Sequence, residues 1–167
     1  MGLDMYLLLD KGRKGSKEVA KVLESAEFWD NKRKNGDKFD GLILAQWRKA
    51  FGILNWFDNN LESVKTQTIN PKFKDREGTQ NYTYYKVGYE EFVKLLVLSR
   101  QILKEAQEDE PNIPEDLYPV GEHFFIGGYS GINEWWWSDI EDTVAMLQEA
   151  EKHIDWNEDD VYFLISY

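Results

Sequence analysis

The 167-residue chain contains no cysteine, which excludes disulfide bonds, thiolate metal sites and cysteine nucleophiles. Its two histidines do not stand at metal-ligand spacing, and no Asp-rich calcium loop occurs, so we predict neither a metal nor a cofactor. No apolar run reaches the roughly 18 residues of a membrane span. The opening lacks the basic start and small-residue cleavage site of a signal peptide. These absences favour a cytoplasmic protein without a membrane partner.

Positive charge is scarce in the second half of the chain. Residues 1–90 hold 16 Lys/Arg and 13 Asp/Glu, giving +3, whereas residues 91–167 hold 4 and 18, giving −14. Such a surface repels phosphate and attracts basic partners, so we expect a basic protein partner and no binding of free duplex DNA. The simpler alternative is a solvated face that only keeps the protein in solution.

Short apolar segments predict three strands of one sheet. They are N-terminal, central and C-terminal: Met5–Leu9, Phe124–Gly127 and Val161–Ser166. A fourth, edge strand is expected in the tyrosine-rich stretch 81–87. Three prolines between residues 111 and 119 predict an extended connection before the central strand.

Apolar residues at spacings of three and four predict the helices. The strongest patterns cover 41–61 and 92–106, and a weaker one covers 17–28. A further helix is expected from Ser138, because Ser138 and Glu141 match a capping box. We predict an α+β fold in a single domain, 1–167, in which three or four helices pack on a small, mainly antiparallel sheet.

Three consecutive tryptophans, Trp135 to Trp137, precede this last predicted helix. In extended backbone Trp135 and Trp137 share one face and Trp136 takes the other, so all three cannot enter one core. We therefore predict that Trp135 or Trp136 is exposed while another ring of the trio packs inside. A groove built from Trp135 or Trp136 with Tyr129 is the best candidate binding site, because tryptophan is a favoured anchor at interfaces.

Two other groups of residues are candidates for ligand binding or chemistry. Arg48 and Lys49, beside tryptophans on the predicted helix 41–61, could receive the phosphate of a nucleotide-like ligand, or could simply form the polar edge of that helix. His123 could act as an acid or base with a carboxylate such as Glu122 or Glu134. Adjacent strand residues point to opposite faces, so His123 and Glu122 do not form a dyad by themselves.

Four short motifs resemble a family of small proteins of unknown function found in phages and bacterial genomes. They are the opening MGLDMYLLL, the segment WRKAFGILNWF, the strand-turn FFIGGY and the aromatic end of the chain. Members of that family open with a nearly identical MGLDMYL and carry WRKxN with a histidine before WF, where this chain has Phe51 and Leu54. The resemblance implies a phage or prophage origin and an interaction role, and it supplies no reaction.

Together these patterns predict a non-catalytic cytoplasmic binding protein. It would act through an aromatic groove and an acidic surface on a basic host protein or a small nucleotide-like ligand. The alternative is a hydrolase or transferase that uses His123 with nearby carboxylates.

Overall fold

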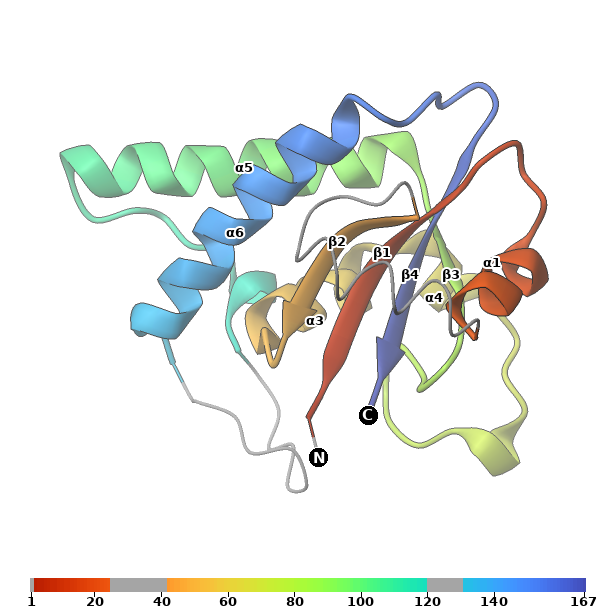
Figure 1. Cartoon of the computed structure of the whole chain (residues 1–167). Helices are drawn as coiled ribbons and strands as arrows, with labels where there is room; N and C mark the ends of the chain where they lie inside the picture. Colours follow the sequence, from red (N-terminus) through yellow and green to blue (C-terminus); the bar gives the residue numbers. More distant parts are fainter. Residues whose placement is uncertain (1, 25–41, 120–130) are drawn as a thin grey trace.

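A four-stranded sheet forms the centre of the protein, as seen in the computed structural model, which describes residues 2–24, 42–119 and 131–167. The strands follow the order β2-β1-β4-β3, and every neighbouring pair is antiparallel. Their bounds are β1 Asp4–Asp10, β2 Ile43–Arg48, β3 Tyr85–Val87 and β4 Asp160–Ser166. All seven residues of β1 pair with β4, which places these two strands in the middle of the sheet (Figure 1).

The two faces of the sheet are covered by different helices (Figure 1). The inner face packs against α3 Phe51–Asn60, α5 Tyr89–Glu108 and α6 Glu134–Glu151, and the outer face carries α1 Ser16–Leu23. The residues of β1 alternate between the inner and the outer face, because successive strand side chains point to opposite faces. The predicted α+β fold is confirmed.

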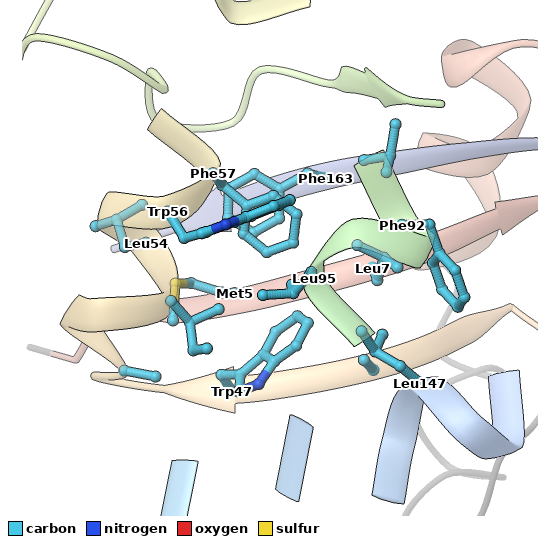
Figure 2. Packing of buried hydrophobic residues seen from close by; sticks show 14 of the residues in the cluster. Met5, Leu7, Trp47, Leu54, Trp56, Phe57, Phe92, Leu95, Leu147 and Phe163 are labelled. Atoms are coloured by element: carbon cyan, nitrogen blue, oxygen red, sulfur yellow. The ribbon is translucent and has the colours of Figure 1, made fainter. Parts of the chain in front are cut away.

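Aromatic rings fill the space between the inner face and the helices (Figure 2). Phe57 of α3 stacks on Phe163 of β4 with ring centroids 4.0 Å apart, and Trp47 and Trp56 meet Phe57 edge-on. Trp47 also donates its indole N–H to Thr143 Oγ1 of α6 at 2.8 Å. This contact ties α6 to the sheet.

The predicted helix over 41–61 is wrong in its first half, because residues 43–48 form the strand β2 and helix α3 begins only at Phe51. A bulge explains the error: Leu7 pairs with Ala45 but Leu8 pairs with Ile43, so Leu44 is an extra residue. The extra residue breaks the two-residue alternation of a strand. The apolar positions therefore fall at the three- and four-residue spacing of a helix.

The last helix also begins earlier than predicted, at Glu134 rather than Ser138. Asn133 is its N-cap, because the side-chain oxygen of Asn133 accepts from the backbone N–H groups of Trp135 and Trp136 at 3.0 and 3.1 Å. Asparagine caps a helix as well as serine does. The three tryptophans are therefore helical, not extended.

Most of the other predicted strands and helices are present in the structure. The strands predicted at 5–9 and 161–166 lie in one sheet, helix α5 covers the predicted 92–106, and β3 lies at a sheet edge as expected but spans only three residues. The helix predicted at 17–28 is present as α1 but ends at Leu23, with Glu24 as its C-cap. Residues 25–28 and the strand predicted at 124–127 lie outside the described residues. The short helices are α4 Glu62–Thr66, η1 Pro71–Phe73 and η2 Glu115–Leu117. None of the helices in the described ranges is long and apolar enough to cross a membrane.

Side chains from two helices cap both edges of the sheet. At the β2 edge the backbone N–H of Gln46 donates to Met146 Sδ of α6 at 3.4 Å. At the β3 edge the hydroxyl of Ser63, in α4, donates to the Lys86 carbonyl at 2.7 Å. On each edge, one backbone group that an added strand would use is thus engaged by a side chain.

Candidate functional site

The first turn of α6 points its three tryptophans in three directions, since successive helical residues are about 100° apart. Trp135 is 62% exposed, Trp136 is only 1% exposed, and Trp137 is half-buried. The prediction that one of the trio is exposed while another packs inside is confirmed. Trp136 is a core residue, so of the two rings proposed for a surface groove only Trp135 reaches solvent.

The burial of Trp136 fixes the position of its exposed neighbour. Its indole N–H donates to the Leu117 carbonyl of η2 at 2.9 Å, and Trp137 meets its ring edge-on at 5.0 Å. Gly52 of α3 makes this contact possible, because a Cβ there would collide with both Leu117 O and Trp136 Nε1. Contacts with η2 and α3 thus lock the turn that presents Trp135.

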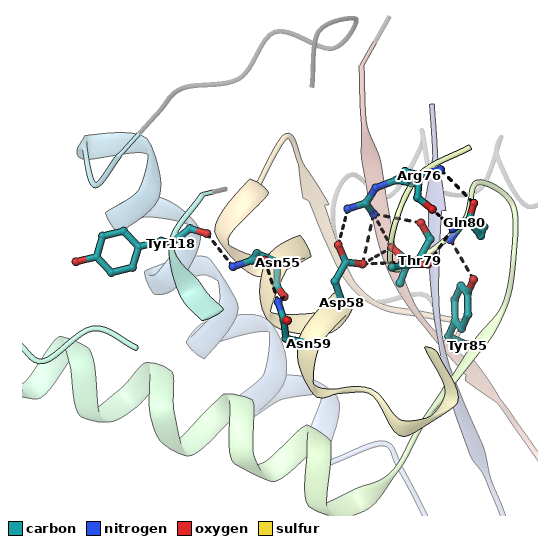
Figure 3. A network of polar contacts seen from close by, with 9 residues as sticks. Asn55, Asp58, Asn59, Arg76, Thr79, Gln80, Tyr85 and Tyr118 are labelled. Carbon is teal, nitrogen blue, oxygen red and sulfur yellow. Dashed lines mark hydrogen bonds and ion pairs between the residues drawn. The ribbon is translucent and has the colours of Figure 1, made fainter. Parts of the chain in front are cut away.

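A second exposed aromatic lies one residue after Leu117. The backbone carbonyl of Tyr118 accepts from the Asn55 amide at 3.1 Å, and the ring of Tyr118 is exposed (Figure 3). Asn60, one turn further along α3, donates to the Asp116 carboxylate at 2.7 Å. The buried amide of Asn55 and the half-buried amide of Asn60 therefore hold the segment that carries Tyr118.

The outer face of α6 combines Trp135 with negative charge. Its exposed residues recur at spacings of three and four: Trp135, Ser138, Asp142, Ala145 and Glu149. Between residues 105 and 151 the sequence has thirteen Asp/Glu and no Lys or Arg. The first cation, Lys152, donates to Glu149 at 3.0 Å, and this hydrogen bond lowers the pKa of that carboxyl. We call the stripe from Trp135 to Glu149 the α6 outer face.

Arg48 and Lys49 belong to a different surface from Trp135. They do not flank a helix as predicted: Arg48 is the exposed last residue of β2, and Lys49 adopts a left-handed backbone with φ 55° that ends the strand. Arg48 pairs in register with Asp4, and its guanidinium lies against Gly2. It therefore points to the outer face of the sheet, whereas α6 packs on the inner face.

The residues of the alternative catalytic site are only partly described. Tyr129, His123 and Glu122 lie outside the described residues. Glu134 is exposed in the first turn of α6. Within the described ranges, no group of three His, Asp or Glu side chains is placed to hold a metal ion.

Sequence reasoning missed two tyrosines that lie at the sheet. Tyr6 faces outward between Gln46 of β2 and Leu164 of β4, and the exposed Tyr82 donates its backbone N–H to the Ile165 carbonyl at 3.0 Å. Burial raises the pKa of Tyr6 to about 12, with Asp4 as the next cause. Alternation in β1 could have placed Tyr6 on this face; no pattern in the sequence predicts the turn at Tyr82.

A polar network holds the loop that leads to Tyr82 (Figure 3). Asp58 of α3 forms an ion pair with Arg76 and accepts from the backbone N–H of Thr79 at 2.8 Å. The backbone N–H of Gln80 donates to the Tyr85 hydroxyl at 3.0 Å. The loop is thereby fixed to both α3 and β3.

Comparison with family models, with curated proteins and with solved structures found no match to this chain. Its function is therefore argued from the surfaces and contacts described above.

Proposed function

We propose that the protein is a non-catalytic binding protein that docks on a basic protein surface through the α6 outer face, with Trp135 as the anchor. One observation carries the proposal: a tryptophan that is 62% exposed stands on a turn that the Asn133 cap and the Trp136 bond to η2 hold in place. Tryptophan is among the residue types most enriched at the energetic centre of protein interfaces. Preorganised aromatic anchors dominate the energy of many interfaces.

The negative charge of this part of the chain favours a basic partner. The stretch 105–151 contains no cation of its own, so a partner's Lys or Arg meets carboxylates and can lie over the exposed indole face. One backbone group on each sheet edge is already bonded to a side chain, which disfavours recognition by strand addition. We place the protein in the cytoplasm, as a phage or prophage accessory protein whose partner is a host protein. Free duplex DNA is not expected to bind.

The test compares three forms of the protein as immobilised bait in a bacterial lysate. They are the wild type, Trp135→Ala and the control Val97→Ala, which removes a side chain 52% exposed on α5. We expect one basic protein, identified by mass spectrometry, to be held by the wild type and the control. Its recovery should fall at least about tenfold with Trp135→Ala, the size expected for an interface hot spot.

Two further measurements decide whether the retained protein is the proposed partner. The affinity of the purified pair should fall as salt rises, because screening shortens to ~8 Å near physiological ionic strength. Charge reversal by Asp142→Lys should also weaken it. A partner that is acidic, that ignores salt, or that Trp135→Ala binds as well as the wild type does would overturn the proposal.

A further inference from the structure

Methionine holds all of the sulfur in this protein. The chain has three methionines and no cysteine, so no thiol competes with a thioether for an oxidant. Met5 of β1 is 0% exposed, whereas Met146 of α6 is half-buried and packs against the core. Met1 lies outside the described residues. Of the two methionines that the structure describes, Met146 is therefore the one that reaches solvent.

The sulfur of Met146 accepts a hydrogen bond from the sheet. The backbone N–H of Gln46 donates to Met146 Sδ at 3.4 Å. Gln46 lies in β2, the end strand of the sheet in the described part of the chain, and pairs in register with Tyr6 of β1. The N–H of Gln46 points away from β1 and toward α6, as alternate N–H groups of an end strand do. The thioether thus holds α6 against the backbone of β2.

A second hydrogen bond joins the same helix to the same strand. The indole N–H of Trp47 donates to Thr143 Oγ1 at 2.8 Å, and Thr143 lies almost one helical turn before Met146. Trp47 and Thr143 are both buried. Helix α6 is therefore attached to β2 through one bond inside the core and one bond to the sulfur of a half-buried side chain.

We infer that Met146 is a redox modification site, at which hydrogen peroxide converts the thioether to a sulfoxide and releases this part of α6 from the Gln46 N–H. A lone pair of Met146 Sδ attacks one oxygen of the peroxide. The O–O bond breaks, an S–O bond forms, and the other oxygen leaves as water, so that sulfur loses the two electrons that the peroxide gains. Sulfoxide reductases reverse this modification. The inference goes beyond the docking role of the α6 outer face and does not depend on it.

Oxidation changes the polarity of the group that meets the sheet. A thioether is apolar and flexible, whereas a sulfoxide is polar and chiral. Because the side chain of Met146 packs against the core, its new S–O dipole favours rotation toward water. The Gln46 N–H then loses its sulfur acceptor. The bond between Trp47 and Thr143 contains no sulfur and remains, so we expect a local release of α6 and not unfolding.

The test treats the full chain with hydrogen peroxide, maps oxidation by tandem mass spectrometry and follows hydrogen exchange by NMR. Met146 should oxidise at least about tenfold faster than Met5, because susceptibility follows exposure. In the oxidised protein the Gln46 amide should exchange at least about fivefold faster, the change expected for one lost hydrogen bond. Exchange of the Trp47 indole should change by less than about twofold. Methionine sulfoxide reductase should return the Gln46 rate to its starting value.

Two leucine variants assign the response to one sulfur atom. Met146→Leu keeps the side-chain volume but removes the acceptor, so the Gln46 amide should exchange about fivefold faster before any peroxide is added. Peroxide should then have no further effect on that amide. The matched control Met5→Leu makes the same change in the core of β1 and should keep the full response to peroxide.

Three results would overturn the inference. The first is a rate of oxidation at Met146 no higher than that at Met5. The second is an unchanged exchange rate of the Gln46 amide once Met146 is fully oxidised, or a response to peroxide that persists in Met146→Leu. The third is an equal rise in exchange at Gln46 and at the Trp47 indole, which would mean that the whole protein opens.

Discussion

Replacing Trp136 by alanine should destabilise the protein strongly, whereas the same change at Trp135 should not. Trp136 is 1% exposed, packs edge-on against Trp137 and donates a buried hydrogen bond to Leu117 O at 2.9 Å. Truncating a buried tryptophan leaves a cavity and costs about 3–5 kcal/mol. The orphaned carbonyl of Leu117 pushes the loss toward the upper end, because an unpaired buried acceptor costs about 1–3 kcal/mol. Trp135→Ala should change stability by less than about 0.5 kcal/mol, as surface changes do.

The two causes can be separated with Trp136→Phe. Phenylalanine keeps much of the ring volume but has no N–H, so its loss of about 1–3 kcal/mol measures mainly the hydrogen bond to Leu117. The assay is urea unfolding followed by far-ultraviolet circular dichroism, since tryptophan fluorescence would itself change in these variants. The slopes of the unfolding curves are compared first, because equal slopes indicate that the unfolded states are alike. The difference between the midpoints then gives the change in stability.

The reasoning would be refuted by either of two results. One is a loss of less than about 1 kcal/mol for Trp136→Ala, which would mean that Trp136 is not in the core. The other is a loss of several kcal/mol for Trp135→Ala, in which case Trp135 contributes to the fold and its exposure no longer argues for a docking role.

Two further predictions concern stability. Gly78→Ala should lower the free energy of unfolding in urea by more than about 2 kcal/mol, because φ is +82° and the new Cβ would collide with the Asp58 carboxyl. The control Gly12→Ala, where φ is +70° and the space is open, should lower it by only ~1 kcal/mol. Equal losses in the two variants would count against the Asp58 contact. Burial raises the pKa of Asp159, but hydrogen bonds from Asp155, Gly12 and Lys11 outweigh it and leave the pKa below its ordinary value. The stability that Asp159 contributes is therefore present above about pH 4 and is lost as pH falls through its folded pKa. Asp159→Asn should accordingly be less stable than wild type near neutral pH, and acid titration of unfolding should show this gap closing at low pH; a gap independent of pH would contradict the assignment.

The sequence predicts the sheet better than the helix boundaries. Segments 5–9 and 161–166 are unbroken apolar runs between polar turns, and that pattern is independent of what they pair with. Residues 43–48 mislead because the bulge at Leu44 is a property of the pairing with β1, which no local pattern records. Pairing with β1 thus makes a strand of residues 43–48, although their apolar spacing is typical of a helix.

The candidate sites divide in the same way. That one of three adjacent tryptophans must be exposed follows from geometry alone, but which one depends on the capping choice of Asn133 over Ser138. The sequence identifies Arg48 as a candidate from its residue type but places it on the wrong element. Its true position follows from the end of β2 at Lys49. Tyr82 could not be found at all, since its left-handed backbone is fixed by contacts with β4.

The pairing of β1 with β4 has a consequence for folding. Asp10 and Asp160, at one end of this pair, are 150 positions apart (160 minus 10), so β4 is made long after β1. At about 5–20 residues per second, β1 waits roughly 8–30 s on the ribosome for its partner. Strand β2 can pair earlier and protect one side of β1, but the other side stays open until β4 enters between β1 and β3. During that interval the leucines of β1 are exposed to other nascent chains. Slower synthesis, a higher temperature or a higher expression level should therefore favour aggregation over folding.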